Sequence, residues 1–148
     1  MSDLIAEIND SEYLFLADIQ QPDHHTLRLV IEEGRPSGES GSLNIAGTVI
    51  SGVTRIEVTN ESRVFELLWE SYVAYSILNE SFATVDSEEC FEGTRFRVYS
   101  KSNFINYAAR ATFASPEYPG PTQHYEVVCQ NHIVNVISVR GPLIVRLR

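Results

Sequence analysis

The residues best suited to chemistry in this chain lie near its C-terminus, in the stretch His124-Tyr-Glu-Val-Val-Cys-Gln-Asn-His132. Cys129 and His132 are three residues apart, which is half of the ligand set of a zinc site. A structural zinc needs four ligands, and only Cys90 and the histidines at 24–25 remain as soft donors. Nothing in the sequence places them nearby. We therefore predict a buried cysteine beside a turn histidine and no metal site.

A second candidate is a polar site on neighbouring strands. His124 and Glu126 are two residues apart, so in a strand they share a face, and Arg97 and Tyr99 do the same earlier in the chain. If the two strands are adjacent, an acid–base pair lies beside an anion-binding arginine. The sequence has no nucleophile elbow, phosphate-binding glycine loop or paired metalloprotease histidines. No catalytic residue is assigned, no cofactor is expected, and a small enzyme or ligand-binding domain around these four residues stays the alternative.

The third candidate is a set of acids and aromatics within residues 66–80. Its members are Glu66, Trp69, Glu70, Tyr72, Tyr75 and Glu80. A face of this composition is suited to docking a basic protein, because opposite charges speed association and aromatic side chains favour interfaces. The alternative is a buried pair of strands with the glutamates facing outward.

The charge of the chain is acidic and unevenly distributed. The net charge is −9, and residues 1–92 hold 18 of the 20 acidic residues but 4 of the 11 basic ones, which leaves −14 there and +5 in residues 93–148. An acidic chain argues against nucleic-acid binding, which needs a concentrated basic surface. The asymmetry indicates either an interaction surface for a basic protein or pairing of the two halves across a sheet.

Length and composition indicate one domain, residues 1–148. Hydrophobic residues make up 43% of the chain and charged residues 21%, as in ordinary globular proteins. The first residues lack the basic and apolar segments of a secretory signal, and no apolar stretch is long enough to span a bilayer. We expect a cytoplasmic protein with free thiols and no membrane partner.

Most of the chain has the alternation and turn residues of strands. We predict strands over 13–19 and 26–32 as a hairpin, 49–58, 94–100, 124–139 as a hairpin turning at Gln130-Asn131, and 143–147. Residues 34–42 are predicted to be a loop, because glycine and proline recur there. For 63–78, two strands are favoured over one helix because the segment is rich in aromatic and β-branched residues.

Two segments have a helical pattern. Ser2 to Ile8 is predicted to form one or two turns, and residues 103–114 the main helix, with a serine cap before it and Pro116 after it. The expected architecture is therefore an α+β domain with one antiparallel sheet of seven or eight strands and one main helix.

Three stretches carry a resemblance to other proteins: Trp69-Glu-Ser-Tyr-Val-Ala-Tyr75, Phe96-Arg-Val-Tyr-Ser-Lys-Ser102 and His124 to His132. Together they resemble small acidic bacterial proteins of unassigned activity, some of whose neighbours are immunity proteins of toxin systems. The resemblance implies a partner-binding protein and assigns no site residues. The leading hypothesis is an acidic, non-enzymatic binding domain, such as an immunity or inhibitor protein for a basic toxin or nuclease. A homodimer that pairs its aromatic strands is a further alternative.

Overall fold

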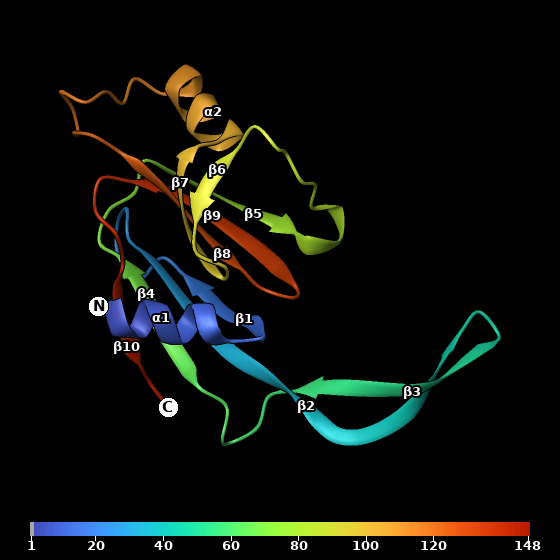
Figure 1. The fold of residues 1–148 in the computed structure, drawn as a ribbon. Helices are drawn as coiled ribbons and strands as arrows, with labels where there is room; N and C mark the ends of the chain where they lie inside the picture. Colours follow the sequence, from blue (N-terminus) through green and yellow to red (C-terminus); the bar gives the residue numbers. More distant parts are fainter. Residues whose placement is uncertain (1) are drawn as a thin grey trace.

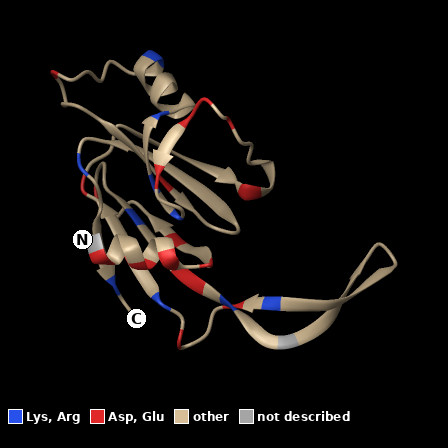
Figure 2. Ribbon diagram, in the orientation of Figure 1, with Lys and Arg blue, Asp and Glu red and all other residues tan. Residues whose placement is uncertain are grey.

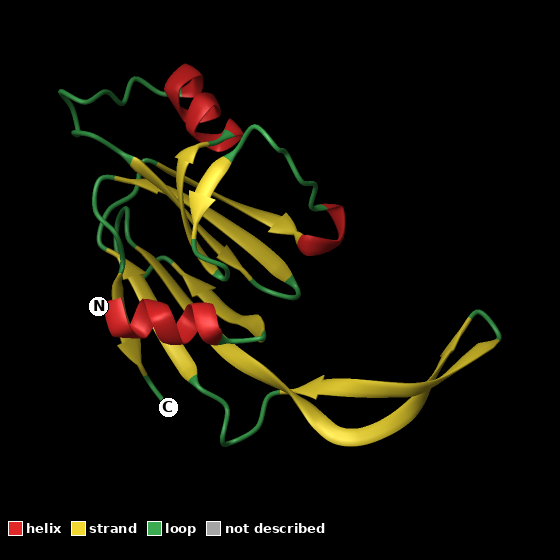
Figure 3. Ribbon diagram, viewed as in Figure 1, coloured by secondary structure: helices red, strands yellow, loops and turns green. Residues whose placement is uncertain are grey.

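The protein folds into two antiparallel sheets that pack face to face (Figures 1 and 3). The structure, a computed structural model, describes residues 2–148, apart from the side chains of Ser2 and Glu39. It contains ten strands, two α-helices and one short 3-10 helix within these residues. The α+β class is confirmed, but the prediction of a single sheet with seven or eight strands is wrong, because the strands divide into two sheets of five.

The first sheet has the order β1-β2-β4-β10, and β3 pairs with the far part of β2. These strands are β1 (Tyr13–Gln20), β2 (Leu27–Ile45), β3 (Thr48–Glu57), β4 (Val64–Trp69) and β10 (Leu143–Arg146). The predicted β1–β2 hairpin is confirmed. The predicted loop at 34–42 is wrong, because these residues continue β2 and mostly pair with β3 through two register irregularities. Glycine in a strand can mark a bulge as well as a loop, and here it does so.

The second sheet has the order β5-β9-β8-β7-β6. Its strands are β5 (Ala74–Asn79), β6 (Cys90–Glu92), β7 (Phe96–Lys101), β8 (Gln123–Val128) and β9 (His132–Ser138), and the 3-10 helix η1 (Glu80–Phe82) follows β5. Residues 63–78 thus form two strands, as favoured from the sequence, but β4 and β5 belong to different sheets. The predicted hairpin around Gln130-Asn131 is confirmed.

The core lies between the sheets. Trp69 and Phe65 of β4 are fully buried against the inward side chains of β8, and the ring centroids of Trp69 and Tyr125 are 6.2 Å apart. The helix α1 (Ser2–Asp10) runs alongside the sheets and adds Ile8 to this core. Strands that are buried on one face read as alternating apolar and polar residues, which is why most of them could be found in the sequence.

The helix α2 (Asn103–Ala111) lies on the outer face of the second sheet (Figure 1). The Ser102 hydroxyl caps it by accepting a hydrogen bond from the Ile105 N–H at 3.0 Å. The helix ends three residues before the predicted boundary at 114, where the Thr112 N–H and hydroxyl both bond to the carbonyl of Ala108. Among residues 2–148, neither helix has the length and apolarity needed to cross a membrane.

Candidate functional site

The most conspicuous feature of the molecule is a two-stranded ribbon that projects from the first sheet (Figure 1). Residues 27–34 of β2 pair with β1 and β4, whereas residues 35–45 pair with β3. We call residues 35–57 the arm. An isolated two-stranded ribbon is marginally stable in water, so one that projects from a body needs either a strong turn or a covering surface.

The arm has one apolar and one polar face. Since side chains alternate along a strand, the ladder pairs Leu43↔Ile50 and Ile45↔Thr48 lie on one side together with Val53. The other side is mostly polar and carries Ser40, Ser42, Asn44, Ser51 and Thr54, together with Val49, which is 64% exposed. We call the first side the apolar face of the arm. Its larger side chains are in water: Leu43 is 46% exposed, Ile45 55% and Ile50 45%.

The register of the arm is fixed by a tight turn and a bulge. Ala46 and Gly47 have φ values of 51° and 85°, so they form a two-residue turn of the type that matches strand twist. The amide of Gly47 also donates to the side-chain oxygen of Asn44 at 3.2 Å. Gly52 has a φ of 76° at a register irregularity in β3, a conformation that favours glycine. The two faces of the arm are therefore defined rather than interchangeable.

The arm carries almost no charge. Glu39 is the one charged residue between Pro36 and Thr54 in the sequence. Figure 2 shows charged residues at the base of the arm and none around its tip. Exposed apolar strands without charged residues are rare in proteins that act alone, because they invite pairing with other chains. This combination is typical of a surface that binds another protein.

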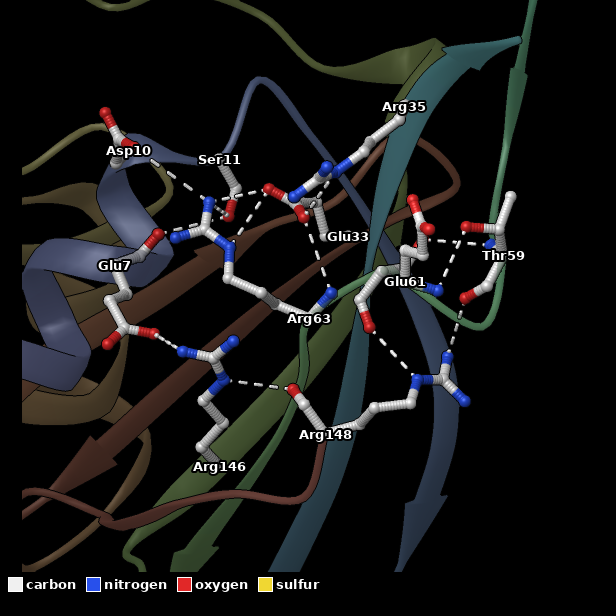
Figure 4. Close-up of polar contacts among 11 residues, drawn as sticks. Glu7, Asp10, Ser11, Glu33, Arg35, Thr59, Glu61, Arg63, Arg146 and Arg148 are labelled. Atoms are coloured by element: carbon white, nitrogen blue, oxygen red, sulfur yellow. Dashed lines mark hydrogen bonds and ion pairs between the residues drawn. The ribbon is translucent and has the colours of Figure 1, made fainter.

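A network of arginines anchors the base of the arm to the body (Figure 4). Its centre is the ion pair between Glu33 and Arg63, which is 2.6 Å long and has side chains only 7% and 16% exposed. Arg35, the first residue of the arm, donates to the same Glu33 carboxylate at 3.0 Å. Burial alone would raise the pKa of Glu33, but the hydrogen bonds from Arg63 and Arg35 outweigh it and hold the pKa below its usual value.

Two C-terminal arginines extend this anchor. Arg148 donates to the backbone carbonyls of Thr59 and Ser62, each at 3.0 Å, and so holds the segment that returns from the arm. Arg146 bonds to Glu7 of α1 at 3.0 Å. The exit and the return of the arm are thus bound to the helix and to the C-terminal segment, which fixes the position of the arm's base on the body.

The predicted polar site is assembled by β7 and β8. Their register places Arg97 opposite Glu126 and Tyr99 opposite His124, as the sequence alternation suggested. One carboxylate oxygen of Glu126 accepts from the Tyr99 hydroxyl at 2.9 Å and from Arg97 at 3.2 Å. Burial raises the pKa of Glu126 despite these bonds, and burial also raises the pKa of Tyr99 to about 12.

His124 is buried, and both of its ring nitrogens have partners. Nδ1 is 2.8 Å from the Ser102 hydroxyl and Nε2 is 2.6 Å from the side-chain oxygen of Asn135. Its ring stacks on Tyr99 with centroids 4.4 Å apart. Burial lowers the pKa of His124, which favours the neutral ring. These contacts fix the start of α2 on the sheet, and none of the four polar-site residues lines the cavities described below.

The acid and aromatic residues of 66–80 do not form one face. Trp69 is fully buried in the core, and Glu66 is paired with Arg28 at 2.7 Å on the outer side of the first sheet. Tyr72 and Tyr75 pack edge to face, and their hydroxyls both accept from Gln21. Glu70 lies in the turn after β4, and Glu80 lies beyond the other end of β5. The six residues therefore face in different directions.

The Cys129 and His132 pair has the geometry of a hairpin end. The Cys129 N–H donates to the His132 carbonyl at 2.9 Å, and the cysteine is buried, which raises the pKa of its thiol to about 12. A thiol with such a pKa is a poor metal ligand at neutral pH. Among residues 2–148, no group of three or more histidine, cysteine, aspartate or glutamate side chains could hold a metal ion.

Most ion pairs lie within one half of the chain rather than between the halves. Nine are seen among the described side chains, and two of them, Lys101–Glu88 and Arg146–Glu7, join residues 1–92 to residues 93–148. Pairing between the halves therefore accounts for only a small part of the asymmetry. A substantial acidic excess stays on the first sheet and α1 (Figure 2).

An apolar groove lies on the far side of the second sheet. It consists of two adjoining cavities of about 300 and 440 Å³, which share Val73, Thr112 and Ala114. The walls come from α2, the segment 112–122 and the outer side of β9 near Ile137. No aspartate, glutamate, lysine or arginine is found among the described residues that line either cavity. We call this feature the groove.

Neither the arm nor the groove was predicted from the sequence. A signal for the arm was present, because uncharged residues with β-branched side chains flank Ala46-Gly47 on both sides. The glycines and serines nearby are typical of a loop, and they led to the prediction of a loop at 34–42. The groove has no such signal, since its walls come from segments that are far apart in the sequence.

A comparison of the chain with protein-family models, with curated proteins and with solved structures finds no match.

Proposed function

We propose that this chain is a non-enzymatic protein-binding domain that contacts its partner through the arm. The observation that supports this most strongly is the exposed apolar face formed by Leu43, Ile45 and Ile50 on a ribbon outside both sheets. Covering apolar surface is favourable by roughly 25 cal/mol per Å². The arm therefore gains free energy when another surface excludes water from this face.

The anchor at the base of the arm supports the same proposal. Glu33 and Arg63 form a buried, hydrogen-bonded pair at the point where the ribbon leaves the first sheet. A binding element held at its base loses less orientational freedom when it docks than a flexible loop would. The network thus prepares the arm for binding without occupying its apolar face.

A finer form of the proposal is an immunity or inhibitor protein for a basic toxin or nuclease. The net charge of −9 supports it, because an acidic surface accelerates the approach of a basic partner. The expected acidic and aromatic face does not support it, since its six residues are dispersed. The arm itself supplies no charge for such a contact beyond its base.

The enzyme alternative rests on Arg97, Tyr99, His124 and Glu126. Their proximity supports it, but Arg97 and Tyr99 already bond to one oxygen of Glu126, and both ring nitrogens of His124 bond to Ser102 and Asn135. A reacting group would have to displace these bonds. The arrangement is better suited to holding α2 on the second sheet than to binding a substrate.

A photo-cross-linking experiment compares the two faces of the arm. A benzophenone amino acid is placed at Ile45 on the apolar face or, as the matched control, at Asn44 on the polar face, and the cells that make the protein are irradiated. We expect an adduct with a second polypeptide from position 45 and a much lower yield from position 44. Equal yields at the two positions, or no adduct at 45, would contradict the proposal.

A further inference from the structure

We infer that the partner of the arm is a second copy of this chain, and that the apolar face of the arm docks in the groove of that copy. This inference rests on the proposed function and names its partner. It joins two apolar features of the molecule, the apolar face of the arm and the groove, which are otherwise both open to solvent.

The shapes and chemistry of the two features are complementary. Leu43 and Ile50 are directly opposite each other in the ladder, and Ile45 is two ladder pairs closer to the tip and so on the same face, which makes the three side chains a ridge. The groove is concave, and its walls include Val73, Ala114 and Ile137. An apolar ridge that enters an apolar groove removes water from both, which is the main source of association free energy in protein interfaces.

The charges favour contact at these two surfaces over contact elsewhere. Each copy carries a net charge of −9, so two copies repel each other wherever their acidic surfaces meet. Glu39 is the one charged residue between Pro36 and Thr54 in the sequence, and the described lining of the groove has no aspartate, glutamate, lysine or arginine. Two like-charged molecules can associate through such neutral surfaces. A basic partner, in contrast, would be matched by acidic residues at the contact.

The arm is placed to fill the groove of another molecule. It leaves the first sheet on the side away from α2, and the groove lies beside α2 at the opposite end (Figure 1). Residues 35–45 of β2 span at most about 36 Å at roughly 3.3 Å per residue. The contact is therefore between different surfaces of two copies. Contacts of this kind produce a ring if the rotation closes and a filament if it does not.

The test uses two variants that each disable one side of the contact. Ile45→Glu places a charge on the apolar face of the arm, and Asn44→Glu is its control on the polar face. Ala109→Glu places a charge in the groove wall, and Ala111→Glu is its control on the same helix, outside the groove. All four positions are exposed residues of a strand or a helix, so the fold should tolerate the substitutions.

Sedimentation velocity over about 1 µM to about 1 mM then gives the mass of each protein. We expect the unmodified protein and both controls to exceed the chain mass of 16.7 kDa as concentration rises. Ile45→Glu and Ala109→Glu should each associate at least about tenfold more weakly, because the docked glutamate would be buried without a partner. Mixed together they should form a pair of one copy each, since one supplies an intact groove and the other an intact arm.

Each other outcome contradicts the inference. An unmodified protein that stays at 16.7 kDa throughout excludes self-association, and a mixture that stays at that mass excludes docking of the arm in the groove. Association that neither Ile45→Glu nor Ala109→Glu weakens places the contact elsewhere. The cross-linking experiment separates these results from the proposed function: an adduct from position 45 with a different protein would retain arm-mediated binding and reject the second copy.

Discussion

Single residues at the base of the arm have two roles: they stabilise the body, and they fix the direction in which the arm leaves it. Glu33 accepts hydrogen bonds from Arg63 and from Arg35, and Arg63 also approaches Asp10 at 3.9 Å. A buried carboxylate that loses its arginine becomes an unpaired charge, which is far more costly than the loss of a surface pair.

Replacing Arg63 should therefore destabilise the protein strongly. For Arg63→Met we expect the free energy of unfolding to fall by about 3 kcal/mol, because Glu33 is left buried with a weakened set of donors. The matched control is Arg55→Met, which removes an exposed arginine that is 3.8 Å from Glu57 and should change stability by less than about 0.5 kcal/mol. Urea unfolding followed by circular dichroism measures both. Similar losses in the two variants would show that the anchor does not stabilise the fold.

His124 should make stability depend on pH. Burial lowers its pKa in the folded protein, so the unfolded chain binds the proton more strongly. The stabilising contribution of the neutral His124 to the free energy of unfolding is therefore complete above the unfolded pKa of about 6.5. It decreases as the pH falls below that value. We expect His124→Gln to lack this decrease between about pH 7 and pH 5.

The difference between variant and unmodified protein is the quantity to measure, because the raised pKa of Glu126 acts in the opposite direction. The folded protein binds the Glu126 proton more strongly than the unfolded chain does, so it gains stability as the pH falls through the raised folded pKa. His24→Gln, in the exposed turn between β1 and β2, is the control for replacing a histidine with glutamine outside the core. An unchanged profile in His124→Gln would mean that His124 does not titrate in this range.

At the scale of elements, the arm is separable from the two sheets. In its outer part, β2 pairs only with β3. The core, in contrast, consists of residues from α1, the two sheets and neighbouring loops. Shortening the arm by replacing residues 38–54 with Asn-Gly should leave the melting temperature of the body nearly unchanged, since surface changes away from the core alter stability by about 0.5 kcal/mol or less. A fall comparable to that of Arg63→Met would show that the arm is part of the folding unit.

The elements that could be predicted from the sequence are those defined by local pattern. Alternation identified β7, apolar runs beside turn residues identified β1 and the β8–β9 hairpin, aromatic and β-branched content favoured β4, and a serine cap with a following proline identified α2. The division into two sheets could not be predicted, because β4 and β5 are neighbours in sequence but pair with β10 and β9, far along the chain. The arm was predicted partly as a loop because glycine at a bulge looks the same in sequence as glycine in a turn.

The candidate sites show the same limit. The grouping of Arg97, Tyr99, His124 and Glu126 followed from period-two alternation and the assumption that β7 and β8 are adjacent, which is confirmed. Whether Trp69 faces the core or a partner could not be decided, because an aromatic residue on a strand suits both. The structure places it in the core, where its ring is tilted against that of Tyr125.

For the whole molecule, the charge and the arm have separate consequences. The acidic surfaces of two copies repel each other over a range set by the screening length, which is about 8 Å at physiological ionic strength. The arm and the groove lie outside the acidic surface, and their apolar side chains contribute to binding only once the two surfaces are in contact. Added salt should therefore leave the arm-mediated contact intact or strengthen it, whereas a contact with a basic partner through the acidic surface would weaken.

Hydrogen–deuterium exchange of the unmodified protein tests the central claim most directly, because it reports whether the arm is covered in solution. Half of the backbone amides in a two-stranded ribbon point away from its partner strand and exchange readily unless another surface protects them. We predict that peptides from residues 40–54 exchange more slowly as the protein concentration rises, together with peptides from 105–116, while β4 is unchanged. Fast exchange in residues 40–54 at every protein concentration, both for the purified protein and in the presence of its cellular partners, would contradict the claim that another surface covers the arm.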